Sequence, residues 1–459
     1  MSGSSKLYRM WIMRRWKRLK TTQIIALVFV GIIILGAALL TLPAASRSGE
    51  SCGFFSALFT STSATCVTGL VLYDTWSQWS GFGQAVILCL IEIGGLGFMS
   101  AASLVVFMLR RKISLRQRMV MAQALSLNEL EGVVRLQKWV LLGSLIIQCA
   151  GAMILFLRFL PEYGVQTAVA WGVFHAVSAF CNAGFDIFGS VAPGQSVIAF
   201  NNDPIVCITL MALIVIGGLG FFVWEEVATV RSFRRLSVYT RLVLLTTAVL
   251  ILLGSGLFLI FEWDNPDTIG QMPVWQKILN AFFQSVTLRT AGFASIDQGM
   301  LTGAGRGLSV VLMIIGGSSG STAGGMKTVT FVVLLLFIKS RIQGKRSVDV
   351  FNRSIPEDKV MDAMTIVSIL MGLCVVGGLF ISATSGVEFT ESLYEATSAL
   401  GTVGLTMGIT TSLSIPAQLL LILFMYFGRV GVLTISLGFL MGDMAKQRYE
   451  YAQTNLLIG

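Results

Sequence analysis

Long apolar runs alternate with shorter, more polar segments along the whole chain. Four of these runs are long enough for a helix to cross about 30 Å of hydrocarbon, which takes about 20 residues. They cover Thr22–Leu42, Trp139–Leu160, Thr240–Glu262 and Val360–Thr384. A second long apolar run follows each of them, at Gly83–Leu109, Ile205–Val230, Leu308–Lys339 and Ala417–Met441. The pattern predicts eight transmembrane helices in four pairs, and hence an all-α polytopic membrane protein.

Between the two helices of each pair lies a shorter segment rich in hydroxyl groups. These segments cover Phe54–Thr65, Ala170–Cys181, Val274–Leu288 and Phe389–Leu400. They are too short to cross a membrane as helices. We therefore predict four re-entrant half-helices, each of which enters the membrane and returns to the same side.

Each half-helix is followed by a glycine, and these glycines recur at a nearly constant interval. Gly69, Gly184, Gly292 and Gly404 are 115, 108 and 112 residues apart. Non-helical backbone at membrane depth is tolerated only where it is buried in protein or faces water. Four such turns around one axis therefore predict a central pore lined by main-chain carbonyls. The predicted divisions are a basic segment at 1–20, pseudo-symmetric repeats at 21–118, 119–235, 236–350 and 351–445, and a tail at 446–459.

Composition agrees with a membrane location. Hydrophobic residues make up 55% of the chain, charged residues make up 12%, and the mean hydropathy is +0.80. The formal net charge of +10 would also suit nucleic acid, but the basic residues gather in short clusters between apolar runs, opposite loops that carry mostly acids. This is the positive-inside distribution, which places both termini in the cytoplasm and argues against nucleic acid as a partner.

The four turns also indicate which ion could pass. The C-terminal ends of the half-helices carry partial negative charge, which favours a cation. The turns contain no ring of carboxylates, so main-chain oxygens are the expected ligands, and these suit a dehydrated monovalent cation. The predicted selectivity filter consists of Thr65, Cys66, Val67, Thr68 and Gly69, then Asn182, Ala183 and Gly184, then Thr290, Ala291 and Gly292, and finally Thr402, Val403 and Gly404.

A second glycine cluster recurs in the later helix of each pair. Residues 93–98 and 216–221 share the sequence Ile-Gly-Gly-Leu-Gly-Phe, which we interpret as close packing between helices through small residues. The third copy is expanded to a segment that cannot hold a helix against the entropic cost of glycine. It consists of Gly316, Gly317, Ser318, Ser319, Gly320, Ser321, Thr322, Ala323, Gly324 and Gly325. We predict that it forms a gate below the filter, with a static break in packing as the alternative.

Several ionisable residues lie in or beside the apolar runs. We predict that Lys327 holds or electrostatically biases the gate, unless its side chain extends to the cytoplasmic interface. Arg429 needs acceptors within its apolar run, and we predict that it contacts the third-repeat loop or lowers cation occupancy below the filter. Glu92 is a candidate for an ion pair, Arg289 for a cap on the third half-helix, and His175 for the core.

Nothing in the apolar runs predicts an enzyme. They carry no paired carboxylates, no Ser/Lys pair and no histidine cluster, and the seven cysteines stand singly, without the spacing of a metal site or a disulfide framework. We therefore expect no covalently bound cofactor.

With these motifs the chain resembles the Trk/Ktr/HKT superfamily of potassium transporters over residues 20–459. Its short loops and compact length are most similar to those of the membrane subunits of bacterial Ktr systems. The resemblance implies that the four spaced glycines belong to the filter, that residues 316–325 form the intramembrane gating loop and that Arg429 is the arginine of the fourth repeat. It implies K⁺ as the transported ion, because sodium-permeable members carry serine at the position of Gly69. A sodium-permeable or sodium-coupled transporter remains the alternative, and stimulation by Na⁺ remains open.

The resemblance also implies partners. Members form homodimers in the bacterial plasma membrane, with one pore in each protomer, and they bind a cytosolic ring of nucleotide-binding subunits of the RCK type. The chain fits this arrangement, because it contains no Gly-x-Gly-x-x-Gly after a soluble strand and no cytosolic loop long enough to form a domain.

Overall fold

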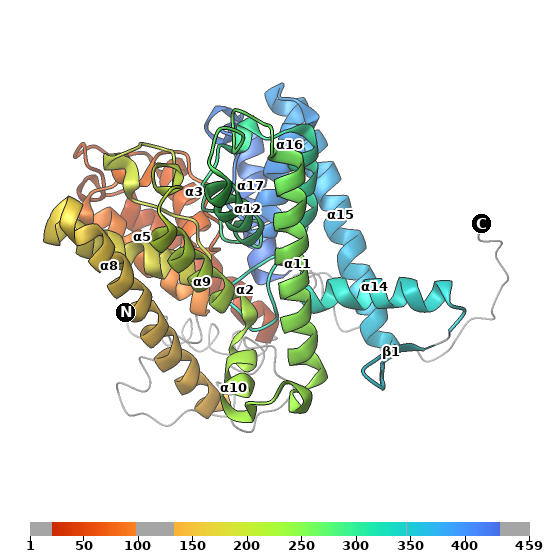
Figure 1. Cartoon of the computed structure of the whole chain (residues 1–459). Coiled ribbons are helices and arrows are strands. Elements are labelled where there is room, and N and C mark those ends of the chain that lie inside the picture. Colours follow the sequence, from red (N-terminus) through yellow and green to blue (C-terminus); the bar gives the residue numbers. More distant parts are fainter. Residues whose placement is uncertain (1–20, 98–132, 346, 432–459) are drawn as a thin grey trace, which may run out of the picture.

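The computed structural model describes residues 21–97, 133–345 and 347–431. The predicted segments at 1–20 and 446–459, and the predicted helical stretches at 98–109 and 432–441, lie outside these residues. The described part is almost entirely helical (Figure 1). Within it, the one sheet is an antiparallel hairpin of β1 (Val348–Val350) and β2 (Arg353–Ile355).

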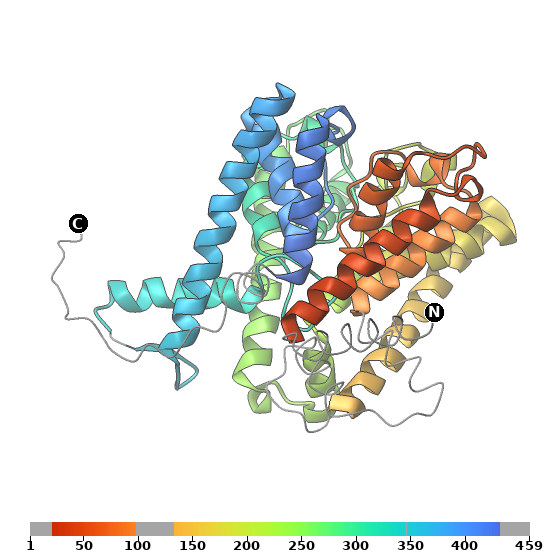
Figure 2. The same cartoon turned by 180° about the vertical axis from the view of Figure 1, so that it is seen from behind.

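The main helices follow one another in the predicted order (Figures 1 and 2). The long helices are α2 (Thr21–Leu40), the first part of α8 (Val133–Phe180), α11 (Val238–Glu262) and α15 (Glu357–Ser385). The short helices are α3 (Phe54–Thr65), the last part of α8, α12 (Val274–Thr287) and α16 (Phe389–Gly401). The helices after them are α5 (Gly81–Leu96), α9 (Pro204–Leu219), α13 (Gly303–Ile314) and α17 (Ile415–Val430).

The remaining elements follow or connect these helices. They are α4 (Thr75–Gln78), α10 (Phe221–Val230), α14 (Thr328–Ile342) and the 3-10 turns Pro43–Ala45, Phe188–Ser190, Ile198–Phe200, Phe233–Arg235, Gln298–Met300 and Thr410–Ser412. Both views show α14 running across α15, with the β-hairpin between them in the chain. Within α8, only Gly164 is non-helical, so the predicted first and short helices of this unit join directly at a kink.

Capping side chains mark where several helices begin. Ser80 Oγ accepts from the N–H of Gly83 at 3.3 Å to start α5, and Thr302 Oγ1 accepts from that of Gly305 at 3.0 Å to start α13. Asp203 caps α9, which has Pro204 in its first turn. Each cap satisfies main-chain donors that have no partner within the helix.

The helices after the turns are shorter than predicted, because each ends at its glycine cluster. Gly97, Gly220 and Gly431 have φ of +83°, +98° and +93°, and residues 315–327 are non-helical between α13 and α14. At Gly220 the chain bends by 94° from α9 into α10. The prediction of one uninterrupted helix over Ile205–Val230 was therefore wrong, whereas the predicted break within Leu308–Lys339 is present at residues 315–327. Hydropathy does not register a backbone conformation that glycine alone adopts without strain.

Side chains are distributed as in a membrane protein. The helices α2, α8, α11 and α15 are long and apolar enough to span a membrane, and the bent pair α9–α10 would be a fifth among the described residues if counted as one span. Large apolar side chains such as Leu142 and Ile146 are exposed on α8, whereas residues 60–65 of α3, mostly serine and threonine, are buried. A surface of apolar side chains around a hydroxyl-rich interior suits a protein that is surrounded by lipid.

Two hydrophobic clusters form the core and reach the four glycine turns. One includes Phe159, Trp171 and Phe180 of α8 and extends to Val67 and Ala183. The other includes Phe258 of α11 and Phe424 of α17 and extends to Cys66 and Val403. The turns are thus held by packed side chains from both halves of the chain.

Candidate ion pathway

The four predicted filter segments share one backbone conformation. The glycines have φ of +99°, +69°, +81° and +91° at Gly69, Gly184, Gly292 and Gly404. The residue two positions earlier also has a positive φ, of +55°, +60°, +69° and +53° at Val67, Asn182, Thr290 and Thr402. The residue between them, Thr68, Ala183, Ala291 or Val403, is not among the positive-φ residues. A non-glycine residue in this region is strained, so its recurrence at four matched positions shows that the surrounding structure imposes it.

The four turns contact one another in a closed ring. A Cβ placed on any of the four glycines would lie 2.7 Å or less from a carbonyl oxygen of the next turn. The contacts run from Gly69 to Ala183, from Gly184 to Ala291, from Gly292 to Val403 and from Gly404 back to Thr68. The glycine spacing predicted that the turns meet, and the structure adds their cyclic order.

Hydroxyl groups of the short helices hold the turns in two ways. In the first and fourth turns the glycine N–H donates to the serine Oγ six residues earlier, at 3.0 Å for Ser63 and 3.1 Å for Ser398. In the second and third turns a hydroxyl donates to the carbonyl of the phenylalanine after the glycine, at 2.7 Å from Ser178 and 2.6 Å from Thr287. The hydroxyl-rich composition of these helices therefore serves the turn geometry.

Oxygen atoms are the candidate cation ligands at the ring. Thr65, Thr68 and Thr402 are buried, and their Oγ1 atoms have no hydrogen-bond partner among the described residues. A buried hydroxyl without a partner is costly. Among the described residues there is no group of three or more His, Cys, Asp or Glu side chains that could hold a metal ion. The chemistry of the ring is therefore that of neutral carbonyl and hydroxyl oxygens.

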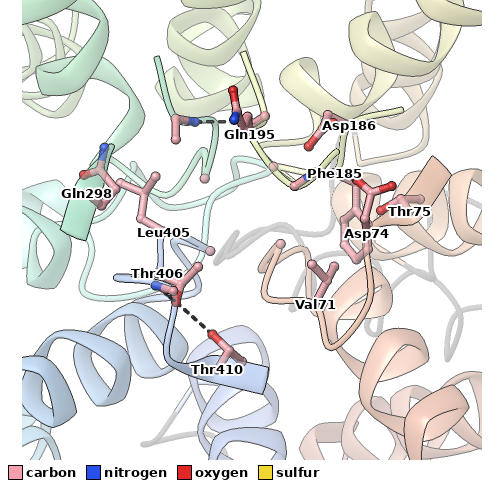
Figure 3. Close-up of a pocket in the computed structure, with 18 of the residues that line it drawn as sticks. Val71, Asp74, Thr75, Phe185, Asp186, Gln195, Gln298, Leu405, Thr406 and Thr410 are labelled. Carbon is pink, nitrogen blue, oxygen red and sulfur yellow. Dashed lines mark hydrogen bonds between the residues drawn. The ribbon is translucent and has the colours of Figure 1, made fainter. Parts of the chain in front are cut away.

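A pocket of about 400 Å³ opens on one side of the ring. Its lining includes all four turn glycines together with the acids Asp74, Asp186 and Asp297 and the polar residues Gln298, Thr406 and Thr410. Figure 3 shows Asp74 and Asp186 on the same side of this pocket, carried by different segments. We call this pocket the outer vestibule. Its acids lie two to five residues after the turn glycines, a regularity that sequence reasoning missed because it treated them only as loop charges.

The carboxylates of the vestibule are fixed in place. Asp74 accepts hydrogen bonds from the N–H groups of Ser77, at 2.8 Å, and Gly194, at 3.1 Å. Asp186 accepts one from the N–H of Phe188 at 3.2 Å. Burial, and secondly the negative charge of Asp74, raises the pKa of Asp186 to about 7. The net negative charge of the vestibule therefore changes near neutral pH.

The expanded glycine segment, residues 316–325, packs against α9, the end of α8 and the fourth turn. Ser318 and Thr322 donate from their N–H groups to the carbonyls of Gly218, at 3.0 Å, and Gly217, at 3.2 Å. The hydroxyl of Thr322 donates to the carbonyl of Phe180 at 3.0 Å. A Cβ on Gly324 would collide with the side chain of Thr402, in the fourth turn. Residues 316–325, which we call the glycine loop, thus touch segments that are far apart in the chain.

Two basic residues hold the glycine loop. Arg429 donates to the carbonyls of Thr322 and Gly94, and to that of Gly95 at 2.8 Å. Lys327 turns back and donates from Nζ to the carbonyl of Ala323 at 2.9 Å. The contact of Arg429 with the loop is present, and the Lys327 ammonium bonds to the loop itself.

The other ionisable residues have structural partners. Arg289 donates to the hydroxyl of Thr328 at 3.3 Å, so the predicted cap on its own helix is wrong. Glu92 accepts from Gln148 at 3.0 Å and from Cys181 at 3.3 Å, and forms no ion pair within the described residues. The ring of His175 is buried and stacks on Phe188. All seven cysteines are free.

The glycine pairs of the first two copies pack as predicted. A Cβ on Gly94 would collide with the carbonyl of Thr65, and one on Gly217 with that of Phe180. The helices α5 and α9 thus approach the ends of α3 and α8 closely, because glycine leaves no side chain between them.

A protein family model for TrkH, described as a cation transport protein, matches residues 14–447 of the chain. The chain belongs to this family. The resemblance found from the motifs is thereby confirmed, and so is the prediction of a transporter and not an enzyme. Together with its apolar helices, membership makes the chain a multi-pass membrane protein.

Members of the TrkH family cover nearly the whole chain. It is 41% identical over 450 residues to the potassium/sodium uptake protein NtpJ of Enterococcus hirae, which covers 96% of this chain and 98% of that protein. It is 37% identical over 435 residues to the Ktr system potassium uptake protein B of Bacillus subtilis, with 95% and 96% covered. The crystal structure of the potassium transporter TrkH from Vibrio parahaemolyticus has the same fold, with a TM-score of 0.71, 18% identity, and coverage of 92% of this chain and 84% of that one.

Proposed function

We propose that this chain is the K⁺-conducting membrane subunit of a bacterial potassium uptake system. The observation that carries the proposal is the closed ring formed by Gly69, Gly184, Gly292 and Gly404. One chain supplies four equivalent turns around one axis, each preceded by a short buried helix, as a carbonyl-lined filter requires. The names of two relatives, a potassium/sodium uptake protein and a potassium uptake protein of a Ktr system, agree with this proposal.

Selection would take place at the ring. Alternation of left-handed and ordinary φ along each turn aims successive carbonyls to one side, so four turns offer stacked rings of oxygens to a dehydrated ion. The C-terminal ends of the four short helices add partial negative charge. The hydroxyls of Thr65, Thr68 and Thr402, which have no partner among the described residues, would supply further oxygens. The outer vestibule, with its aspartates, would concentrate cations above the ring.

The glycine loop would be the gate. It packs below the ring against Thr402 and Phe180, and Arg429 and Lys327 bring two positive charges to the same place. Positive charge and packed main chain beneath the filter oppose the exit of a cation. A glycine-rich segment without helical hydrogen bonds can also adopt a second conformation at low cost.

The remaining parts of the proposal concern architecture and partners. Four pseudo-symmetric repeats would supply eight spans and four re-entrant helices around the pore, with both termini in the cytoplasm. Two chains would form a dimer with one pore each, and a cytosolic ring of nucleotide-binding subunits would control the gate. No covalently bound cofactor is required, because K⁺ itself is the cargo.

A sodium-permeable or sodium-coupled transporter is the second candidate. The relative with 41% identity is named a potassium/sodium uptake protein, and the vestibule carboxylates would attract Na⁺ as well as K⁺. Sodium could act as cargo or as a stimulating ion, and measurements with each cation alone and with both together separate these cases.

The test is ion flux into proteoliposomes that contain the purified chain. A variant that lacks Ser318–Thr322 accompanies the native chain, so that a closed gate cannot conceal a functional pore. We expect K⁺ flux in both, higher in the deletion, and lower flux when Na⁺ replaces K⁺. Flux no greater than that of protein-free liposomes, in a deletion variant that elutes like the native protein, would refute the pore. Equal or lower flux in the deletion than in the native chain would mean that the loop supports the pore and does not close it.

A further inference from the structure

The glycine loop rests in an elbow formed by two neighbouring elements. One arm is α10, which leaves α9 at the 94° bend of Gly220. The other arm is the first turn of α11, and Figure 1 shows α10 beside that end of α11. A Cβ on Gly220 would lie 2.9 Å from the carbonyl oxygen of Ser319, so the loop and the bend are in direct contact.

Two hydrogen bonds join the loop to this elbow. The N–H of Phe221, the first residue of α10, donates to the carbonyl of Gly320 at 2.8 Å. The phenol of Tyr239 donates to the carbonyl of Ser319 at 3.0 Å. The first bond comes from main chain at a helix start. The second bond comes from the side chain of Tyr239, so a substitution can remove it without altering the backbone.

Tyr239 is itself held within the elbow. Its ring lies 6.2 Å from that of Phe222 on α10, at 67°, in an edge-on arrangement. On the next turn of α10, Glu226 accepts from the hydroxyl of Ser237 at 2.7 Å, and also from that of Thr240. Ser237 caps the start of α11. The carboxylate of Glu226 therefore joins the two arms through Ser237 and Thr240, which lie on either side of Tyr239 in the sequence.

The connection between the arms is basic and accessible. Arg231, Arg234 and Arg235 are exposed, and Arg231 has a left-handed φ of +49° at the end of α10. These residues belong to a cytoplasmic cluster in the proposed topology. A movement of this segment would change the separation of α10 and α11, and with it both bonds to the glycine loop.

We propose that Tyr239 is a positioning residue that holds the glycine loop in its closed conformation. Opening the loop requires release of the Tyr239 phenol from the Ser319 carbonyl, and displacement of the elbow between α10 and α11 provides that release. This inference rests on the proposed function of the loop as a gate. It adds the residue through which the cytoplasmic end of α11 acts on the loop.

The variant Tyr239→Phe tests the proposal, because it removes the hydroxyl and keeps the ring that packs on Phe222. Its matched control is Tyr426→Phe, which removes a phenol that donates to the main-chain carbonyl of Ala26 on α2 at 2.9 Å and not to a carbonyl of the glycine loop. In proteoliposomes without any partner, we expect Tyr239→Phe to raise K⁺ flux about 2- to 10-fold, the range set by one net hydrogen bond. The control and the K⁺/Na⁺ ratio should not change.

Hydrogen–deuterium exchange gives a second readout that does not depend on flux. Tyr239→Phe should increase exchange in peptides that cover residues 316–325 and leave those that cover residues 54–69 unchanged. Glu226→Gln should act in the same direction, because it weakens the junction of the two arms, whereas Glu225→Gln on the same helix is its control. The Glu226 pair keeps the test available if Tyr239→Phe is poorly produced.

The outcomes separate this inference from the proposed function. If hydrogen–deuterium exchange of the glycine loop is unchanged in Tyr239→Phe, Tyr239 does not hold the loop, whatever the flux. Increased exchange with unchanged flux means that Tyr239 holds the loop but that the loop is not a gate, and the deletion of Ser318–Thr322 should then also leave flux unchanged. If flux rises in the deletion variant but not in Tyr239→Phe, the role of Tyr239 is refuted, whereas the role of the glycine loop as a gate is supported.

Discussion

The guanidinium of Arg429 donates to the carbonyl oxygen of Gly95 at 2.8 Å, although the two residues are 334 positions apart. The same side chain donates to the carbonyl of Thr322. One arginine of the fourth repeat therefore joins the end of α5 to the glycine loop. Hydrogen bonds of this kind, with a charged donor, contribute about 1.5–3 kcal/mol each.

Removal of this arginine should release the loop. We expect Arg429→Ala to raise K⁺ flux of the membrane subunit alone by about tenfold, which corresponds to about 1.4 kcal/mol. The control is Arg306→Ala, which also removes a guanidinium bound to two carbonyls, those of Leu301 at 2.9 Å and Gly299 at 2.7 Å. Flux in proteoliposomes at equal protein content is the measurement. Loss of flux in Arg429→Ala alone would assign the arginine to support of the pore.

The ring of glycines predicts a selectivity defect for any side chain within it. A Cβ on Gly404 would collide with the carbonyl of Thr68, and the φ of +91° adds strain. Displacement of that carbonyl should lower the ratio of K⁺ to Na⁺ flux about tenfold in Gly404→Ser, which is about 1.4 kcal/mol. Gly69→Ser should change the ratio in the same direction.

The control for these variants is Gly386→Ser. Gly386 has a φ of +67° at the end of α15, but nothing lies within 4 Å of its Cβ position. It carries the backbone strain without the carbonyl contact. If all three variants keep the native ratio of K⁺ to Na⁺ flux, the ring does not select.

Asp186 predicts a dependence of uptake on external pH. Its pKa of about 7 lies above the usual 3.8, so the carboxyl is neutral below about pH 7 and negative above it. With sub-saturating K⁺, uptake should fall as external pH decreases from about 8 to about 6, because the vestibule loses negative charge. The same shift lowers the stability of the fold as pH rises from about 4 to about 7, because the folded state then retains a proton that the unfolded state has lost.

Substitution separates Asp186 from the other acids of the vestibule. Asp186→Asn should abolish the pH step and hold uptake near its acidic level. Asp297→Asn removes another vestibule charge from an exposed side chain, so it should lower uptake and leave the step in place. An unaltered pH step in Asp186→Asn would assign it to another group.

The distribution of charge predicts which loops face outward. In a variant without the seven cysteines, cysteine introduced at 47 or 267 should react with an impermeant reagent from outside, and cysteine at 235 or 345 only from inside. These four positions are exposed in the structure. The same labelling should find residue 112, outside the described residues, on the inner side. Reaction of residue 235 from outside would invalidate the proposed orientation.

Much of the local structure could be predicted from the sequence. The short helices α3, α12 and α16 end within one residue of their predicted limits, because apolar length and the following glycine are local properties. The interval between the turn glycines, the breakdown of helix at residues 316–325 and the need of Arg429 for acceptors are also properties of composition and spacing.

The relations between distant residues were decided only by the tertiary structure. The cyclic order of the ring, the left-handed φ of Val67 and its equivalents, the bend at Gly220 and the seat of Ser319 against Tyr239 all depend on packing between segments far apart in the chain. Hydropathy and spacing record which residues are apolar or small, but not which main-chain groups meet. The four turns meet, and the strained φ values within them are held, only when segments far apart in the chain pack together. That packing is a property of the whole fold.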